Sequence, residues 1–135
     1  MNNIYIEGVH DAYFVPTVSF DVASGVCELS GESYLEETTK FYNPLFDWIR
    51  EFTEKEKRPL IFNFKLNYFN TSSSKCLVDL LTMLKNYEKK GGKVEVNWYY
   101  DDSDEDVEEE LEEVEDFMLE TGLDIKKIPI SELDD

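Results

Sequence analysis

The chain has 135 residues, of which 41% are hydrophobic and 14% aromatic, so it suits one folded domain with one core. Its formal net charge of −18 argues against binding nucleic acid or an anionic membrane through the surface. No apolar run approaches the roughly 20 residues of a membrane span. The first residues lack the basic and apolar regions of a signal peptide, so we expect a cytoplasmic protein.

The negative charge is concentrated in one segment. Residues 101–120 hold 13 of the 31 acidic side chains and no lysine or arginine, which leaves 18 acidic against 13 basic residues elsewhere. A basic partner surface is the expected counterpart, although solubility alone also accounts for the charge. The sequence leaves open whether this segment contacts a partner.

Few residues point to a metal, a cofactor or catalysis. Cys27 and Cys76 fit buried thiols of a reducing compartment, and a single histidine supplies neither a zinc site nor a catalytic triad. The acidic loop resembles the start of a calcium loop, but Val107 stands where such a loop needs glycine. A hydroxyl nucleophile lacks an activating base, because His10 is distant in sequence and Lys75 is the one nearby amine. We therefore expect no metal, no cofactor and no enzyme.

The N-terminal part reads as short strands. We expect a strand over residues 3–7, a connecting loop over 10–16, and a hairpin with strands over 17–22 and 26–30. Gly31 is expected to end the second hairpin strand.

A helix follows and runs to about residue 53, with a buried stripe at helical spacing. The stripe is Phe41, Leu45, Trp48 and Phe52. Pro44 either kinks this helix or marks the first turn of its second half. Residues 54–59 read as a solvated exit loop.

The central stretch is a strand, a polar turn and a helix. Residues 60–66 alternate apolar and polar, and the leucines after residue 76 recur at helical spacing. A further strand over 93–99, an acidic loop over 101–106, a helix from Val107 to Gly122 and an edge strand over 125–130 follow.

These elements predict an α/β fold: a single domain over residues 1–130, followed by a frayed acidic tail over 131–135. Strand–helix–strand units require parallel neighbours, so we expect a mixed, mostly parallel sheet with helices packed on it and an N-terminal antiparallel hairpin. Parallel strands end at the same edge, which places the turn at 70–74, the strand end at 99–100 and the acidic loop on one rim.

The turn is Asn70-Thr71-Ser72-Ser73-Ser74, a run of hydroxyls at a helix start. Such side chains cap the free N–H groups of a first helical turn, and we expect Ser74 to be a cap. The same N–H groups and the helix dipole favour a phosphate.

The order of elements and the hydroxyl turn are similar to the STAS domain of anti-sigma-factor antagonists, whose turn carries Asp-Ser-Ser-Gly. The resemblance to the SiaC family of regulatory phosphoproteins is closer and covers nearly the whole chain. It is carried by residues 62–75, Phe-Asn-Phe-Lys-Leu-Asn-Tyr-Phe-Asn-Thr-Ser-Ser-Ser-Lys, together with 91–94, Gly-Gly-Lys-Val, and 96–100, Val-Asn-Trp-Tyr-Tyr. The glycine of the STAS turn is replaced here by Ser73 or Ser74.

The resemblance implies partner switching. A Ser/Thr protein kinase would phosphorylate Thr71, with Ser72 and Ser73 as fallback acceptors, and a PPM-type phosphatase would reverse the reaction. The unphosphorylated protein would bind and promote a diguanylate cyclase, or another effector protein. Two alternatives are an anti-sigma-factor antagonist that binds a kinase-type anti-sigma factor, and a constitutive adaptor that is never phosphorylated.

The predicted partner-binding residues all lie at the rim. They are Asn67, Tyr68, Phe69, Asn70, Ser72, Ser73, Tyr99, Tyr100, Asp101 and Asp102.

Overall fold

The computed structural model describes residues 1–10 and 13–134. Across these residues six strands form one mixed sheet in the order β1-β4-β5-β6-β7-β8. Their bounds are β1 (Ile4–Ile6), β4 (Thr17–Asp21), β5 (Val26–Ser33), β6 (Leu60–Phe69), β7 (Val94–Tyr100) and β8 (Lys126–Pro129). β1, β4 and β5 pair antiparallel, whereas β5, β6, β7 and β8 run parallel. The predicted mostly parallel sheet with an N-terminal antiparallel hairpin is confirmed.

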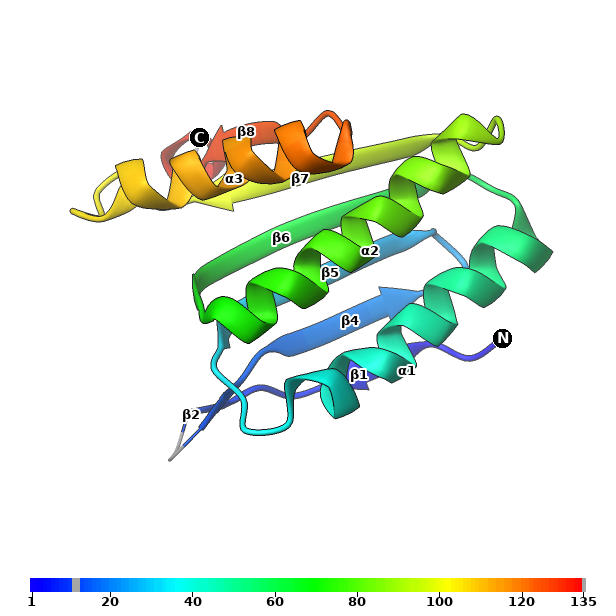
Figure 1. Ribbon diagram of the computed structural model, residues 1–135, viewed down its shortest axis with the longest axis horizontal. Helices are drawn as coiled ribbons and strands as arrows, with labels where there is room; N and C mark the ends of the chain where they lie inside the picture. The colour runs from blue at the N-terminus through cyan, green and yellow to red at the C-terminus, as the bar shows by residue number, and fades with distance from the viewer. Residues whose placement is uncertain (11–12, 135) are drawn as a thin grey trace.

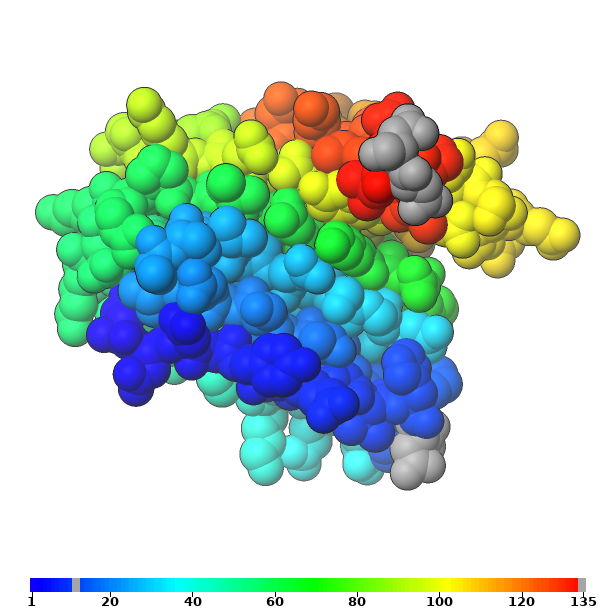
Figure 2. Space-filling model, turned by 180° about the vertical axis from the view of Figure 1, so that it is seen from behind, coloured from blue at the N-terminus to red at the C-terminus, as the bar shows by residue number. Residues whose placement is uncertain are grey.

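The helices form a single layer on one face of the sheet. The α-helices of the described residues are α1 (Thr38–Glu51), α2 (Thr71–Lys89) and α3 (Val107–Thr121). Figure 1 shows all of them in front of the sheet, with α2 over the central strands and α3 over β7. From behind, the strands themselves make up the surface (Figure 2). The fold is therefore a two-layer arrangement.

The core lies between these layers, because the alternation along β6 sends one set of side chains toward the helices. Phe62 and Phe64 are fully buried, and their rings stack at 4.7 Å between centroids. Phe64 stacks in turn on Trp98 of β7 at 5.0 Å, and Phe20 of β4 meets Phe62 at 5.3 Å. Each fully buried ring contributes roughly 1.5–3 kcal/mol relative to exposure. This aromatic row fixes the strands whose ends build the rim.

The other face of the sheet is polar. Asn97 donates from Nδ2 to Oδ1 of Asn63 at 2.9 Å. Lys65 lies 3.5 Å from Glu28 and 5.2 Å from the ring centroid of Tyr99. These polar pairs suit a sheet face with no helix on it.

Two N-terminal expectations were wrong. Instead of a plain loop, β2 (Val9–His10) and β3 (Phe14–Val15) pair antiparallel as a small second sheet, while residues 11–12 lie outside the described part. The second hairpin strand does not end at Gly31, because a register shift after that residue lets β5 continue to Ser33. Gly31 has φ of +93°, which a residue without Cβ adopts at little cost.

The first helix also differs from expectation at both Pro44 and its end. Pro44 is exposed inside α1, which runs on either side of it without a break. Residues expected as an exit loop continue as a π-helical turn, Phe52–Glu56, which ends at Lys57 in the left-handed conformation. Tyr42, outside the predicted stripe, is fully buried, whereas Phe41 is only half-buried.

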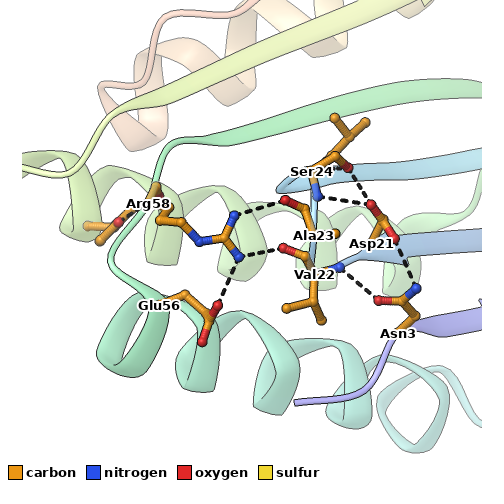
Figure 3. Close-up of polar contacts among 9 residues, drawn as sticks. Asn3, Asp21, Val22, Ala23, Ser24, Glu56 and Arg58 are labelled. Carbon is orange, nitrogen blue, oxygen red and sulfur yellow. Dashed lines mark hydrogen bonds and ion pairs between the residues drawn. The ribbon is translucent and has the colours of Figure 1, made fainter.

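Arg58 then ties this helix exit to the β4–β5 turn. Its guanidinium donates to the carbonyl oxygens of Val22 at 2.6 Å and Ala23 at 3.0 Å, and pairs with Glu56 at 2.8 Å (Figure 3). In the same view Asp21 accepts hydrogen bonds from Ser24. The contacts stabilise the end of the sheet opposite the rim.

The C-terminal elements follow the prediction closely. α3 ends at Gly122 with φ of +74°, and β8 lies at the sheet edge. Ile130–Asp134 form a 3-10 helix that overlaps the segment 131–135 expected to be a frayed tail, and residue 135 is outside the described part. No helix among the described residues is both long and apolar enough to cross a membrane.

Candidate functional site

The hydroxyl turn joins β6 to α2, and Asn70 caps the helix. Asn70 has extended backbone, and its Oδ1 accepts the N–H of Ser73 at 3.0 Å. Its own N–H donates to the carbonyl oxygen of Ser33 at the end of β5, at 3.1 Å. The side-chain cap is therefore the amide of Asn70 rather than the expected hydroxyl of Ser74.

Ser73 is buried in a chain of hydroxyls that links β5, α1 and α2. Its Oγ donates to the carbonyl of Ser33 at 3.0 Å and lies 2.7 Å from Ser33 Oγ. Ser33 Oγ lies in turn 2.8 Å from the hydroxyl of Tyr42. Burial raises the pKa of Tyr42 to about 12, despite hydrogen bonds that lower it. Ser73 thus fixes the position of the turn from inside the protein.

The two hydroxyls before Ser73 are exposed, but only one of them is tied down. Ser72 Oγ donates to Oδ1 of Asn70 at 3.2 Å and lies 2.8 Å from Oγ1 of Thr38 in α1. Thr71 is the first residue of α2 and is exposed at the rim. The same short turn therefore offers hydroxyls in different environments.

Thr71 borders a cavity between α2 and α3, here named the threonine hollow. It has a volume of about 300 Å³. Its lining residues are Phe69, Asn70, Thr71, Ser74, Val78, Glu113, Asp116, Phe117 and Glu120. Glu113, Asp116 and Glu120 of α3 thus line the same cavity as Thr71.

A second cavity, the acidic hollow, adjoins the first and measures about 210 Å³. It is lined by Asn67, Tyr68, Phe69, Asp104, Asp106, Glu109, Glu110 and Glu113. Phe69 and Glu113 line both hollows, so the two lie next to each other. Burial raises the pKa of Glu110 and of Glu113, and neighbouring carboxylates raise each further.

The predicted partner-binding residues do not all meet at these hollows. Tyr99 stands over Lys65 on the open face of the sheet, and Tyr100 packs half-buried against the core. Asp101 accepts hydrogen bonds from Ser103, and Asp102 accepts one from Ser131 at 2.7 Å. Residues 67–71 line the hollows. The other predicted residues do not line them: Ser72, Ser73, Tyr99, Tyr100, Asp101 and Asp102.

Several residues that shape the site escaped sequence reasoning. Ser33, Thr38 and Tyr42 carry the buried hydroxyl contacts, and no local pattern reveals their partners. Glu113, Phe117 and Glu120 follow one another at intervals of four and three residues, about one helical turn each. This spacing places them on the same side of α3, the side that meets the turn. That spacing is the one signal which identifies them in the sequence. Among the described residues, no cluster of His, Cys, Asp or Glu is arranged to hold a metal ion.

The fold is an α/β domain whose hydroxyl turn exposes Thr71 at the rim. A family model of SiaC family regulatory phosphoproteins matches residues 9–128. The chain therefore belongs to the SiaC family of regulatory phosphoproteins, and it is a regulatory protein rather than an enzyme.

The relatives come from Pseudomonas aeruginosa. An uncharacterised protein of strain UCBPP-PA14 is 32% identical over 113 residues, which cover 84% of this chain and 87% of the relative. The crystal structure of apo-SiaC superposes with a TM-score of 0.83 at 26% identity, over 95% of this chain and 99% of SiaC. A chain of the crystal structure of the diguanylate cyclase SiaD in complex with its activator SiaC gives a TM-score of 0.79 at 27% identity, over 92% and 99% of the two chains.

Proposed function

We propose that this protein is a phosphorylation-controlled partner switch whose unphosphorylated form binds and activates a diguanylate cyclase in the cytoplasm. The chain belongs to a family of regulatory phosphoproteins, and a relative is described as the activator of a diguanylate cyclase. The observation that carries the proposal is the exposed Thr71 hydroxyl at the N-terminus of α2, on a turn held rigid from inside.

Thr71 is the phosphoacceptor in this proposal, because access separates it from its neighbours. Ser73 is fully buried and hydrogen-bonded, so a kinase reaches it only if the turn unfolds. Ser72 is exposed, but its hydroxyl is engaged by Asn70 and Thr38. Ser72 is therefore the fallback acceptor, and Ser73 a positioning residue.

A phosphate on Thr71 changes the docking surface more than the fold. It adds roughly −1.5 to −2 charges, which the N-terminal N–H groups of α2 favour. It also enters a hollow that already holds the carboxylates of Glu113, Asp116 and Glu120. A partner that packs against the neutral turn then meets a hydrated dianion, and the complex dissociates.

The docking surface of the proposed effector is the rim around Thr71. Its members are Asn67, Tyr68, Phe69, Asn70 and Ser72 at the turn, with Tyr99, Tyr100, Asp101 and Asp102 at its border. A Ser/Thr protein kinase adds the phosphate, and a PPM-type phosphatase removes it.

The test combines partner recovery with an activity assay. Tagged wild-type, Thr71→Ala and Thr71→Asp forms are purified from the host, and Ser72→Ala serves as the matched control. We expect a diguanylate cyclase to co-purify with wild type, Thr71→Ala and Ser72→Ala but not with Thr71→Asp. We also expect cyclic di-GMP synthesis by the purified cyclase to rise only when a form that binds it is added.

Other outcomes favour other functions. A kinase-type anti-sigma factor in place of the cyclase identifies an anti-sigma-factor antagonist. If Thr71→Asp keeps every partner and mass spectrometry finds no phosphate on the wild type, the protein is a constitutive adaptor and the switch is refuted.

A further inference from the structure

An aromatic cluster stands on the surface at the same rim and has no part in the hydroxyl turn. The ring of Tyr34, which follows β5, lies 6.5 Å from that of Tyr13, 6.4 Å from that of Phe14 and 6.3 Å from that of Tyr68. Tyr13 and Tyr34 are each 43% exposed and Tyr68 is 49% exposed. Exposed rings that gather in this way are typical of protein-binding surfaces.

The backbone holds this cluster in place. Phe14 and Tyr34 form an isolated antiparallel bridge, with N–H···O distances of 2.9 and 2.8 Å. Tyr68 belongs to β6, whose register sets it against Glu32 of β5. The backbone beneath the cluster is therefore held in place, which lowers the ordering cost when a partner binds.

Beside the rings lies a shallow, open and largely apolar depression of about 410 Å³, here named the aromatic hollow, lined by Phe14, Glu32, Tyr34 and Tyr68. Tyr68 also lines the acidic hollow, which shares Phe69 and Glu113 with the threonine hollow. The aromatic, acidic and threonine hollows therefore follow one another along a single rim. Along this surface the aromatic rings come first, the carboxylates of the acidic hollow next, and Thr71 last.

Resting on the proposed function, we propose that the effector docks through a segment that seats an apolar side chain in the aromatic hollow and lays lysine or arginine side chains along the acidic hollow. Charge complementarity selects this occupant. Carboxylates of Asp104, Asp106 and Glu109 line the acidic hollow, so an acidic or neutral segment leaves them uncompensated.

The order of the hollows adds a specificity rule. The apolar anchor and the basic run must be adjacent in the effector, because Tyr68 is shared by the two hollows. The anchor lies away from Thr71, so it holds the segment in register while the phosphate acts at the other end of the rim.

The probe is a short synthetic peptide with leucines next to a run of lysines, titrated into the full-length isotope-labelled protein and followed by NMR chemical shifts. Matched peptides replace leucine with serine, replace lysine with glutamate, or separate the leucines from the lysines. We expect the first peptide to bind about tenfold or more tightly than each of the others. We also expect its largest shifts at the aromatic and acidic hollows.

Protein variants locate the site. Tyr34→Ser and Tyr68→Ser each weaken binding about fivefold or more, whereas Tyr5→Ser, an exposed tyrosine of β1, leaves it unchanged. Glu109→Gln with Glu113→Gln weakens binding, whereas Glu108→Gln with Glu112→Gln removes the same charge from α3 outside the hollows and has a smaller effect. Circular dichroism verifies that every variant is folded.

Three results overturn the inference: equal binding of the leucine-free peptide, loss of affinity in Tyr5→Ser equal to that in Tyr68→Ser, or self-association of the protein that Tyr68→Ser abolishes. The last result assigns the hollow to a second copy of the chain. No cyclase enters this assay, so failure of the peptide leaves cyclase activation intact, and failure of cyclase activation leaves peptide binding measurable.

Discussion

Neighbouring hydroxyls on one turn have different roles because their surroundings differ. Thr71 borders a hollow, Ser72 is held by two partners at the surface, and Ser73 is buried against Ser33. Removing a buried hydroxyl breaks hydrogen bonds that water cannot replace, whereas removing an exposed one changes little.

Ser73→Ala should therefore reduce the free energy of unfolding by about 1–3 kcal/mol, because two buried hydrogen bonds from Ser73 Oγ to Ser33 are lost. Thr71→Ala should change the free energy of unfolding by less than about 0.5 kcal/mol. Urea denaturation followed by circular dichroism measures both, with Ser72→Ala as the intermediate case. Equal stability of the Ser73 and Thr71 variants would contradict the positioning role of Ser73.

At the scale of the element, α3 is a helix whose apolar side anchors it and whose acidic side faces water and the hollows. Val114 and Phe117 are buried in the core. Glu110 lies half-buried at the border and accepts the indole N–H of Trp98 at 3.1 Å. Burial is the largest cause that raises the pKa of Glu110, and the charges of Asp104 and Glu113 add to it against the Trp98 hydrogen bond.

This shift gives a stability effect that depends on pH. The folded state binds the proton more tightly than the unfolded chain, so the stability linked to Glu110 is complete below the ordinary pKa of 4.5 and is lost as pH rises through the raised value. Glu110→Gln keeps an acceptor for Trp98 and removes the charge. It should stabilise the protein above this window by no more than about 1 kcal/mol, since solvent screens a half-exposed group.

Thermal denaturation between about pH 4 and pH 7 measures the effect, because it spans the ordinary carboxyl pKa values. The gain from Glu110→Gln should grow with pH. Glu108→Gln, on the exposed side of the same helix, controls for the loss of charge alone. The assignment would be contradicted if the extra stability of Glu110→Gln relative to Glu108→Gln did not change with pH.

At the scale of the whole molecule, charge is unevenly distributed. The net charge is −18, and most of the excess lies in the acidic loop at the rim and in α3, which starts beside that loop and packs over β7. The lysines and arginines near residues 50–58 and 85–93 lie toward the other end of the sheet. Like charges gathered at one end repel one another in the compact state.

Moderate sodium chloride should therefore stabilise the protein. The screening length falls from about 10 Å at 0.1 M to about 3 Å at 1 M, which weakens the repulsion among surface carboxylates. A gain of about 1 kcal/mol corresponds to a rise in Tm of roughly 3–6 °C for a domain of this size.

Differential scanning calorimetry across a salt series measures this rise. A variant with Glu108, Glu109, Glu112 and Glu115 replaced by Gln has less repulsion to screen and should respond less. A Tm that falls with added salt in the wild type would show that ion pairs outweigh the repulsion.

The sequence by itself determined the class of fold and the place of the turn. The alternation of residues 60–66 and the leucines of α2 define a strand and a helix through local periodicity, so the parallel strand–helix order could be read without coordinates. The motif around Thr71 pointed to the family that the family model matches. These features depend on residues that are close in sequence, so they can be recognised from the sequence alone.

Tertiary structure decided which residues share a surface. Gly31 reads as a strand end, but its neighbours in β6 let β5 continue through a bulge to Ser33. Only that extension brings Ser33 to Ser73 and the Tyr34 ring to Tyr68, across 40 and 34 positions of the chain. Burial of a hydroxyl and juxtaposition of hollows depend on contacts between distant segments, which no local periodicity encodes.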